Sequence, residues 1–373
     1  RLRGPKDSKV NLKILRRGVK ELLPFTVKRD KIPVYSLDAS YMIKDKIGYI
    51  RINRFAATTH EEFKKALAEL QKKGMKDLIL DLQGNGGGYL NAAIDIANEF
   101  LGKKELIVYT EGRRNPRSEF FAKGTGEFQN GRLIVLVDEF SASASEIVTG
   151  AVQDWDRGVV VGRRSFGKGL VQRPIDLPDG SMIRLTVARY YVPSGRSIQK
   201  PYDEGKEKYY TDIYQRLLHG EFSQKDSIHF DEKLKFQTVG GRTVYGGGGI
   251  MPDLFVPGDT VGFSRYLVEV NRKNQYLYDR HRQETKNIKD YKQLLKYLDR
   301  FDLVNEMADY AAAKGLKRDE KGIRDSYDVL DSLIKAFIGR HVLDDDGFYP
   351  ILYQNDVTIK KAIEAQGTGV QAD

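Results

Sequence analysis

Cysteine is absent from this sequence of 373 residues, and histidine is scarce. Without cysteine there can be no disulfide, no thiolate metal site and no cysteine nucleophile. None of the histidines lies in a glycine-rich turn, and no two have the HExxH spacing of zinc peptidases. These histidines are His60, His219, His229, His281 and His341. We therefore expect no metal site and no cofactor.

Long apolar runs are also absent, since none reaches the ~20 residues that a membrane-spanning helix needs. We expect no integral membrane segment. The net charge of +10 is spread along the chain and mixed with acidic residues. This pattern favours a solvated surface over nucleic-acid binding. The length predicts two or three folded domains. Because the sequence starts at Arg1 without a methionine or a signal peptide, we expect a fragment or a mature chain.

Strand and helix patterns alternate through the middle of the chain. Short apolar strands are predicted at 78–82, 133–137 and 158–162, after an alternating strand at 47–52. Thr58 and Glu61 fit a capping box at the start of a helix that ends at Gly74. Apolar residues between 92 and 100 predict another helix. Alternation of this kind is typical of a largely parallel sheet with helices packed on it.

The two ends of the chain differ from this middle part. Apolar residues alternate at 10–14 and at 25–27, which predicts a β-hairpin. A further strand is predicted at 183–192. The segment 200–240 is polar and tyrosine-rich, and its weak periodicity predicts only an excursion from the core. Helical patterns fill 261–340, so we expect a separate helical domain. It carries no chemical motif and suits a structural extension or an oligomer contact better than a lid.

The stretch from 133 to 172 contains the parts of a serine nucleophile and its base. Ser141, Ser143 and Ser145 follow the strand at 133–137, and Lys168 stands between two glycines after the next apolar run. A serine hydroxyl needs a base to take its proton, and lysine serves when burial lowers its pKa. No motif supports a histidine in this role, although a buried one stays an alternative. These residues alone do not choose among the three serines.

A glycine run at 84–88 follows another predicted strand. Glycine allows the backbone to approach a substrate, so its N–H groups could stabilise an oxyanion. The other interpretations are a tight strand–helix turn or a phosphate-binding loop. The run lacks the Lys-Ser/Thr ending of a P-loop, which argues against nucleotide binding.

Five motifs together resemble the C-terminal processing peptidases, or tail-specific serine peptidases. They are 81–88 (DLQGNGGG), 141–147 (SASASEI), 165–172 (SFGKGLVQ), 190–199 (YYVPSGRSIQ) and 249–253 (GIMPD). Each is moderately specific, but they occur in the family's order across roughly residues 1–257. The segments 2–6 (LRGPK) and 29–33 (RDKIP) resemble the end of a PDZ domain.

The resemblance assigns a role to each candidate residue. It implies Ser143 as the nucleophile, Lys168 as the general base and Gln172 as a residue that helps to hold the lysine. The oxyanion donors would be the N–H groups of Ala144 and Gly87. The chain has Gln83 where the family commonly has Arg, Gly86 where it has Pro, and Ser165 where it often has Thr. The first two changes put the rigidity of the glycine loop in question.

The implied fold is α/β, with a ClpP/crotonase-like core, a partial PDZ hairpin at residues 1–31, a peptidase core at 32–257 and a helical extension at 258–373. The implied function is a serine endopeptidase that cleaves polypeptides with unstructured apolar C-termini at or near that end, in the bacterial periplasm or cell envelope. A homo-oligomer is compatible with the pattern. The alternatives are a catalytically silent peptide-binding or scaffold protein and an acyl-thioester enzyme, which leaves the Ser/Lys pairing unexplained.

Overall fold

The computed structural model describes residues 2–16, 19–31, 34–202, 205–259, 264–270, 280–281 and 283–368. The chain divides into two compact units, Arg1–Tyr35 and Ser36–Asp373. The second unit contains a mixed α/β core with a parallel-strand sheet and a helical C-terminal region, which confirms the predicted fold class. The predicted boundaries at 31/32 and 257/258 stay predictions.

The first unit is a β-hairpin, as the alternating pattern predicted. β1 (Lys9–Ile14) pairs antiparallel with β2 (Leu23–Lys28), with Val10 opposite Val27 and Leu12 opposite Phe25. Phe25 and Val27 are 43% and 45% exposed. The PDZ character of this hairpin stays a prediction, and the predicted residues 32 and 33 of that resemblance lie outside the described residues.

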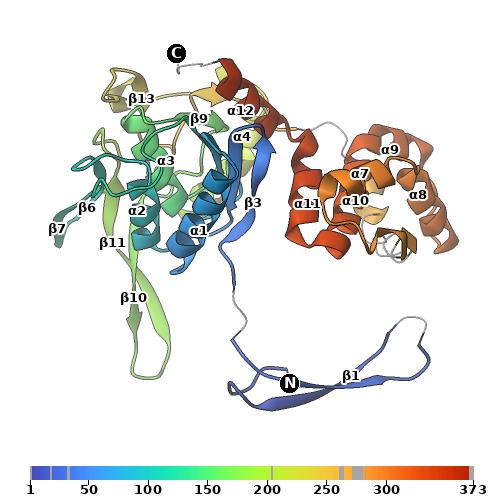
Figure 1. The fold of residues 1–373 in the computed structure, drawn as a ribbon. Helices are drawn as coiled ribbons and strands as arrows, with labels where there is room; N and C mark the ends of the chain where they lie inside the picture. The colour runs from blue at the N-terminus through green and yellow to red at the C-terminus, as the bar shows by residue number, and fades with distance from the viewer. Residues whose placement is uncertain are drawn as a thin grey trace. The chain divides into compact units, whose positions relative to one another are not determined.

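A six-stranded sheet forms the centre of the second unit (Figure 1). Its strand order is β14 (Leu254–Phe255), β9 (Val159–Gly162), β8 (Leu133–Val137), β5 (Asp77–Asp81), β4 (Ile47–Ile52) and β3 (Leu37–Lys44). All neighbouring strands are parallel except β3, which is antiparallel to β4. Because Asp81 pairs with Leu136, β5 and β8 end side by side. The loops that follow them therefore meet at one edge of the sheet.

Helices cover both faces of this sheet, which explains why its strands read as nearly continuous apolar runs. Leu80 and Val135 pack with α1 (Thr59–Lys72), α2 (Leu90–Asn98) and α3 (Ala144–Asp154). Ile79 and Ile134 face the other way and pack with α11 (Asp345–Leu352) and α12 (Val357–Thr368). Successive residues of one strand thus enter different hydrophobic clusters.

The predicted capping box at the start of α1 is wrong. Thr58 is the N-cap residue, but it has the helical angles φ −92° and ψ −5°, and its side chain caps no backbone N–H. Its hydroxyl instead donates to Glu62 Oε1 at 2.6 Å. Glu62 Oε2 accepts the N–H of Ser36 at 2.7 Å, so this carboxylate binds the residue just before β3 and does not cap the helix. Gly74, with φ +89°, follows the end of α1 as predicted.

A second, antiparallel sheet flanks the core. Its order is β10 (Leu170–Asp176), β11 (Met182–Tyr191), β6 (Leu106–Gly112) and β7 (Asn115–Phe121). β10 and β11 form a long ribbon that extends away from the helices (Figure 1). β11 confirms the strand predicted at 183–192. The segment that was predicted as an excursion contains a helix, α4 (Lys206–Leu218). Short elements follow: η1 (Lys225–Ser227), η2 (Glu232–Leu234), β12 (Lys235–Gln237) and β13 (Thr243–Tyr245).

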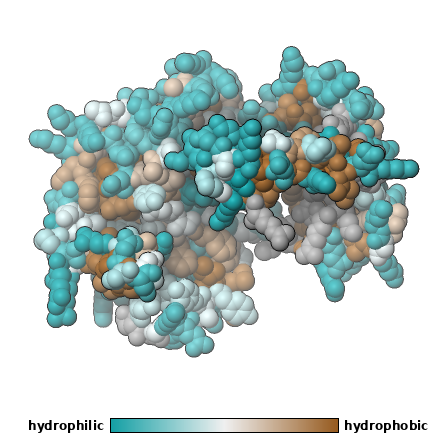
Figure 2. Space-filling model, turned by 90° about the horizontal axis from the view of Figure 1, so that it is seen from below, coloured by the Kyte–Doolittle hydropathy of each residue, from teal (hydrophilic) through white to brown (hydrophobic). Residues whose placement is uncertain are grey.

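Helices predominate after β14, which confirms the helical pattern. They are α5 (Arg265–Val270), α7 (Tyr291–Leu298), α8 (Leu303–Ala313), α9 (Glu320–Asp325) and α10 (Tyr327–Leu343), followed by α11, η4 (Tyr353–Asn355) and α12. In the described part of the chain, no helix has the length and apolar character needed to cross a membrane. Figure 2 shows one face of the molecule, where hydrophilic residues predominate and hydrophobic ones form separate patches.

Candidate active site

Ser143 stands at the N-cap of α3, directly beside a cavity. It has φ 59° and ψ −112°, a conformation that a residue with a side chain rarely adopts. Strain of this kind concentrates at functional sites and resembles the turn that exposes a nucleophilic serine between a strand and a helix. The turn between β8 and α3 therefore holds the backbone of Ser143 in a strained conformation, and its side chain borders the cavity.

The two neighbouring serines are bound elsewhere. The Ser141 hydroxyl donates to the carbonyl oxygen of Leu82 at 2.8 Å, and the Ser145 hydroxyl donates to that of Asn85 at 2.8 Å. Both serines are fully buried, whereas Ser143 lines the cavity. Their hydroxyls thus attach the α3 turn to the glycine loop after β5, and Ser143 is the serine of the three that faces open space.

The glycine loop lies against Ser143. Gly87 has φ +96°, and a Cβ atom on it would lie 2.7 Å from Ser143 Cβ and 2.9 Å from the Ala144 nitrogen. No larger residue fits there without movement. The Gly87 N–H, however, donates to Asn85 Oδ1 at 2.9 Å. Among the described residues, the N–H groups of Ala144, Gly86 and Gly88 have no hydrogen-bond acceptor.

Lys168 lies in the loop between β9 and β10 and lines the same cavity as Ser143. It is half-buried, and its Nζ forms no hydrogen bond or ion pair with any described residue. Gln172 is exposed on β10 and also borders the cavity, but its side chain makes no hydrogen bond within the described part of the chain. Its predicted role in holding the lysine stays a prediction.

Glu146 joins the turn of Ser143 to the loop of Lys168. Its Oε2 accepts the backbone N–H groups of Ser143 at 2.7 Å and Lys168 at 2.9 Å. Its Oε1 accepts the Ser165 hydroxyl at 2.6 Å and the Gly167 N–H at 2.7 Å. The carboxyl group is fully buried, and this burial raises its pKa, while the four donors oppose the rise.

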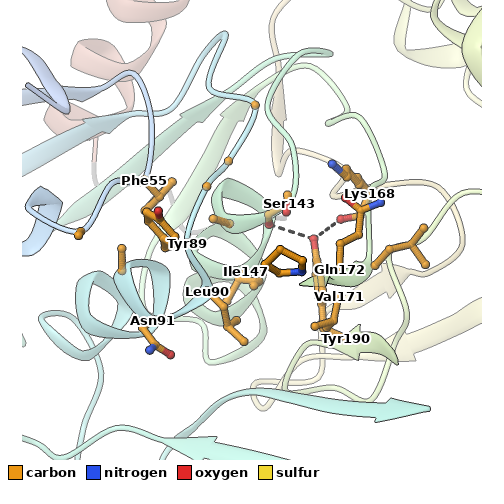
Figure 3. A pocket seen from close by; sticks show the side chains of 18 of the residues that line it. Phe55, Tyr89, Leu90, Asn91, Ser143, Ile147, Lys168, Val171, Gln172 and Tyr190 are labelled. Carbon is orange, nitrogen blue, oxygen red and sulfur yellow. Dashed lines mark hydrogen bonds between the residues drawn. The ribbon is translucent and has the colours of Figure 1, made fainter. Parts of the chain in front are cut away.

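Tyr190 connects the same two segments from the other side. Its hydroxyl donates a bifurcated hydrogen bond to the carbonyl oxygen of Ser143, at 3.0 Å, and to that of Lys168 (Figure 3). Burial raises the pKa of Tyr190 far above its ordinary value, so the hydroxyl keeps its proton and donates. Glu146 and Tyr190 both lie within the recognised motifs, but the sequence assigned neither a function, because most of their partners belong to segments that are distant in the chain.

The cavity has a volume of about 990 Å³ and is open to solvent. More of its wall is apolar than polar, and Figure 3 shows Ser143 and Lys168 among the residues that line it. The apolar lining includes Phe55, Leu90, Ile147, Val171 and Met182. His60 also borders the cavity, but its Nε2 lies 2.6 Å from Glu99 Oε1 and no hydrogen bond joins it to Ser143. The site could therefore hold an apolar polypeptide segment beside a serine and a lysine.

Known proteins match the part of the chain that forms this site. Residues 46–205 match the model of peptidase family S41, and residues 268–344 match a family of unknown function (DUF8443). A carboxyl-terminal-processing protease of Synechocystis sp. (strain PCC 6803) is 41% identical over 203 residues, which cover 54% of this chain and 47% of that protein. The carboxy-terminal processing protease CtpB of Bacillus subtilis (strain 168) is 39% identical over 202 residues, which cover 54% and 42%.

A solved structure of a photosystem II D1 C-terminal processing protease has 32% sequence identity and a TM-score of 0.40, over 52% of this chain and 54% of that one. The chain spans about half the length of the curated relatives named above. The matched region includes the β5 glycine loop, the α3 turn and the lysine loop. Residues 46–205 are thus similar to peptidase family S41, and the same part of the chain is similar to carboxyl-terminal processing proteases.

Proposed function

We propose that this chain is a serine endopeptidase in which Ser143 is the nucleophile and Lys168 the general base. One observation carries the proposal: the strained Ser143 and the unpaired Lys168 amine border the same apolar cavity. A lysine with no competing partner can accept a serine proton if it reaches the hydroxyl in its neutral form. No hydrogen bond joins the two side chains among the described residues, and in this proposal they come within hydrogen-bond distance when substrate binds.

The reaction begins when the Lys168 amine takes the proton of the Ser143 hydroxyl. The serine oxygen then bonds to the scissile carbonyl carbon, and the C=O electron pair moves onto the oxygen. The lysine ammonium returns the proton to the leaving amine as the C–N bond breaks. In the second half, the same lysine takes a proton from a water molecule while the water oxygen bonds to the acyl carbon. The ester C–O bond to Ser143 then breaks, and the lysine returns the proton to the serine oxygen.

The oxyanion needs N–H donors that have no acceptor of their own. The Ala144 N–H meets this requirement and lies at the positive end of the α3 dipole. We assign the second donor to Gly87, as the family resemblance implies. Its bond to Asn85 Oδ1 would then have to yield to the substrate oxygen. The neighbouring unbonded N–H groups of Gly86 and Gly88 lie in the same loop.

The apolar lining supports an extended apolar polypeptide as the substrate. The relatives are carboxyl-terminal processing proteases, and on that basis we assign cleavage at or near C-termini. The motif resemblance is our basis for proposing the bacterial periplasm or cell envelope as the location and a PDZ origin for the N-terminal hairpin. Gln172 is proposed to orient Lys168 from β10.

The test measures cleavage of an unfolded protein with an apolar C-terminus. Ser143→Ala and Lys168→Ala should each lower the rate by about 10³-fold or more, because each removes one half of the nucleophile–base pair. Ser118→Ala and Lys206→Ala, on exposed positions, are the matched controls and should keep the wild-type rate. Labelling with a fluorophosphonate should depend on Ser143. Equal cleavage by Ser143→Ala and the wild type would reject the assignment, and a chain that binds but neither cleaves nor labels would be a scaffold.

A further inference from the structure

Helix α4 contacts the segment that leads into the lysine loop. Arg216, near the end of α4, donates from Nη2 to the carbonyl oxygen of Arg164 at 2.7 Å and from Nη1 to that of Ser165 at 3.1 Å. These carbonyls belong to the residues that lead directly into the loop of Lys168. Arg216 is 5% exposed, so these two carbonyl oxygens replace water as hydrogen-bond acceptors of its guanidinium group. Neither contact involves the cavity.

A shared carboxylate fixes the direction of Arg216. Glu221, just after α4, accepts from Arg216 Nε at 2.7 Å and receives a two-pronged contact from Arg164 at 2.7 and 2.6 Å. Glu221 is 6% exposed, and two guanidinium groups therefore share one buried carboxylate. Such planar forks are geometrically specific, which restricts both arginines to one arrangement. The pKa of Arg216 is lowered by burial and by Arg164.

Lys200 makes a second group of contacts that connects the lysine loop to α4. Lys200 lies 4.0 Å from the centre of the Phe166 ring and 4.4 Å from that of Tyr209 on α4, and its amine pairs with Asp212 at 2.9 Å. The Lys200 N–H also donates to the Gly167 carbonyl oxygen at 3.0 Å. Helix α4 thus contacts the loop through backbone, aromatic and charged groups.

These contacts matter because the Lys168 amine has no hydrogen bond that would position it. Glu146 binds the N–H groups of Gly167 and Lys168, while Arg216 binds the carbonyl groups of Arg164 and Ser165. The loop backbone is therefore bound both at its N–H groups and at its carbonyl groups. We propose that Arg216 is a positioning residue for the general base, and that residues 209–221 form a brace that sets the distance between Lys168 and Ser143. This inference rests on the proposed function.

Arg216→Met tests the brace, because methionine fills a similar space but donates no hydrogen bond. A short apolar peptide substrate should show kcat lowered by about 10²-fold, since a displacement near 1 Å has this effect on catalysis. KM should change little because α4 does not line the cavity around Ser143.

Lys206→Met is the matched control, because it removes one positive charge from an exposed position of the same helix. Arg216→Lys should restore part of kcat, since an ammonium group keeps the charge beside Glu221 but lacks the fork that reaches both carbonyls. If Arg216→Met does not fold, Arg216→Lys carries the test alone. A folded Arg216→Met variant with wild-type kcat, or one whose loss appears in KM and not in kcat, would overturn the inference while the wild type remains active. Failure of the proposed function would instead appear as an inactive, unlabelled wild type.

Discussion

At the scale of single residues, Glu146 places an ionisable carboxyl group in a fully buried environment. Its carboxylate is fully buried and accepts four hydrogen bonds from the two segments that carry Ser143 and Lys168. Glu146→Gln would turn an NH₂ group toward some of these donors. We expect the free energy of unfolding to fall by about 1–3 kcal/mol for each buried donor left unpaired. We also expect a lower kcat, since both segments lose their common anchor.

The same substitution should change how stability depends on pH. Burial raises the pKa of Glu146 above its ordinary value of 4.5, so the folded protein binds this proton more tightly than the unfolded chain. The stabilising contribution of this difference is complete below pH 4.5 and is lost as the pH rises through the raised pKa. Urea unfolding of the wild type and of Glu146→Gln at a series of pH values measures it as a difference. The exposed Glu61→Gln is the control, and parallel curves for Glu146→Gln and the wild type would contradict the prediction.

The candidate site illustrates what single residues of a sequence can reveal. Ser143 and Lys168 could be named because the motifs of a known family mark them. The reason that Ser143 differs from Ser141 and Ser145 is visible only in three dimensions, where the other hydroxyls bind backbone carbonyls of the glycine loop. The roles of Glu146 and Tyr190 likewise depend on contacts between segments that lie about twenty to fifty residues apart in the chain.

At the scale of elements, strands β5, β8 and β9 were predictable from their apolar runs, since both faces of these strands are buried, and β4 was predictable from its alternating pattern. Helix α4 was not predictable in this way. Its buried residues are Tyr209 and Arg216, and Arg216 is a charged residue at a position where periodicity analysis expects an apolar one. The helix buries an arginine because backbone carbonyls and Glu221 satisfy it, and no sequence pattern reports such partners.

The β10–β11 ribbon has two faces with different surroundings. Pro174 pairs with Arg184 and Asp176 with Met182, so these residues share one face, and three of them border the cavity. Ile175 pairs with Ile183 on the opposite face. Met182 and Ile183 are 55% and 47% exposed, so these two neighbours have similar exposure but lie on opposite faces of the ribbon.

The difference between the two faces predicts which side chains of the ribbon contact a long substrate. Met182→Ser should raise KM for an unfolded polypeptide about fivefold, which corresponds to about 1 kcal/mol of lost apolar contact. Ile183→Ser should leave KM unchanged, because that side chain points away from the cavity. Steady-state kinetics with a long polypeptide and a short peptide would compare the two. Equal effects of both substitutions would show that the ribbon does not guide the substrate by its cavity face.

At the scale of the whole second unit, the C-terminal helices complete the core of the peptidase sheet. Ile359, Ala362 and Ala365 of α12 belong to one buried cluster with Ile79 and Ile134 of the sheet. Gln366 Nε2 also donates to the Leu78 carbonyl oxygen at 3.3 Å. The sequence predicted a separate helical domain because the pattern changes after Gly258. A change of periodicity identifies a different kind of element, but it contains no information about which surface that element covers.

Unfolding of Ile359→Ala would decide whether these helices and the sheet form one cooperative structure. Ile359 is 2% exposed, and removing its side chain should lower the free energy of unfolding by about 2–5 kcal/mol. Trp155, the single tryptophan, donates from Nε1 to the Leu106 carbonyl oxygen and packs with the cluster on the opposite face of the sheet. Its fluorescence therefore reports the other layer. If the layers unfold together, the urea midpoint of Trp155 falls in Ile359→Ala and stays near the wild-type value in the exposed control Lys360→Ala. An unchanged Trp155 midpoint, with earlier loss of helical circular dichroism, would instead establish the helical region as an independent domain.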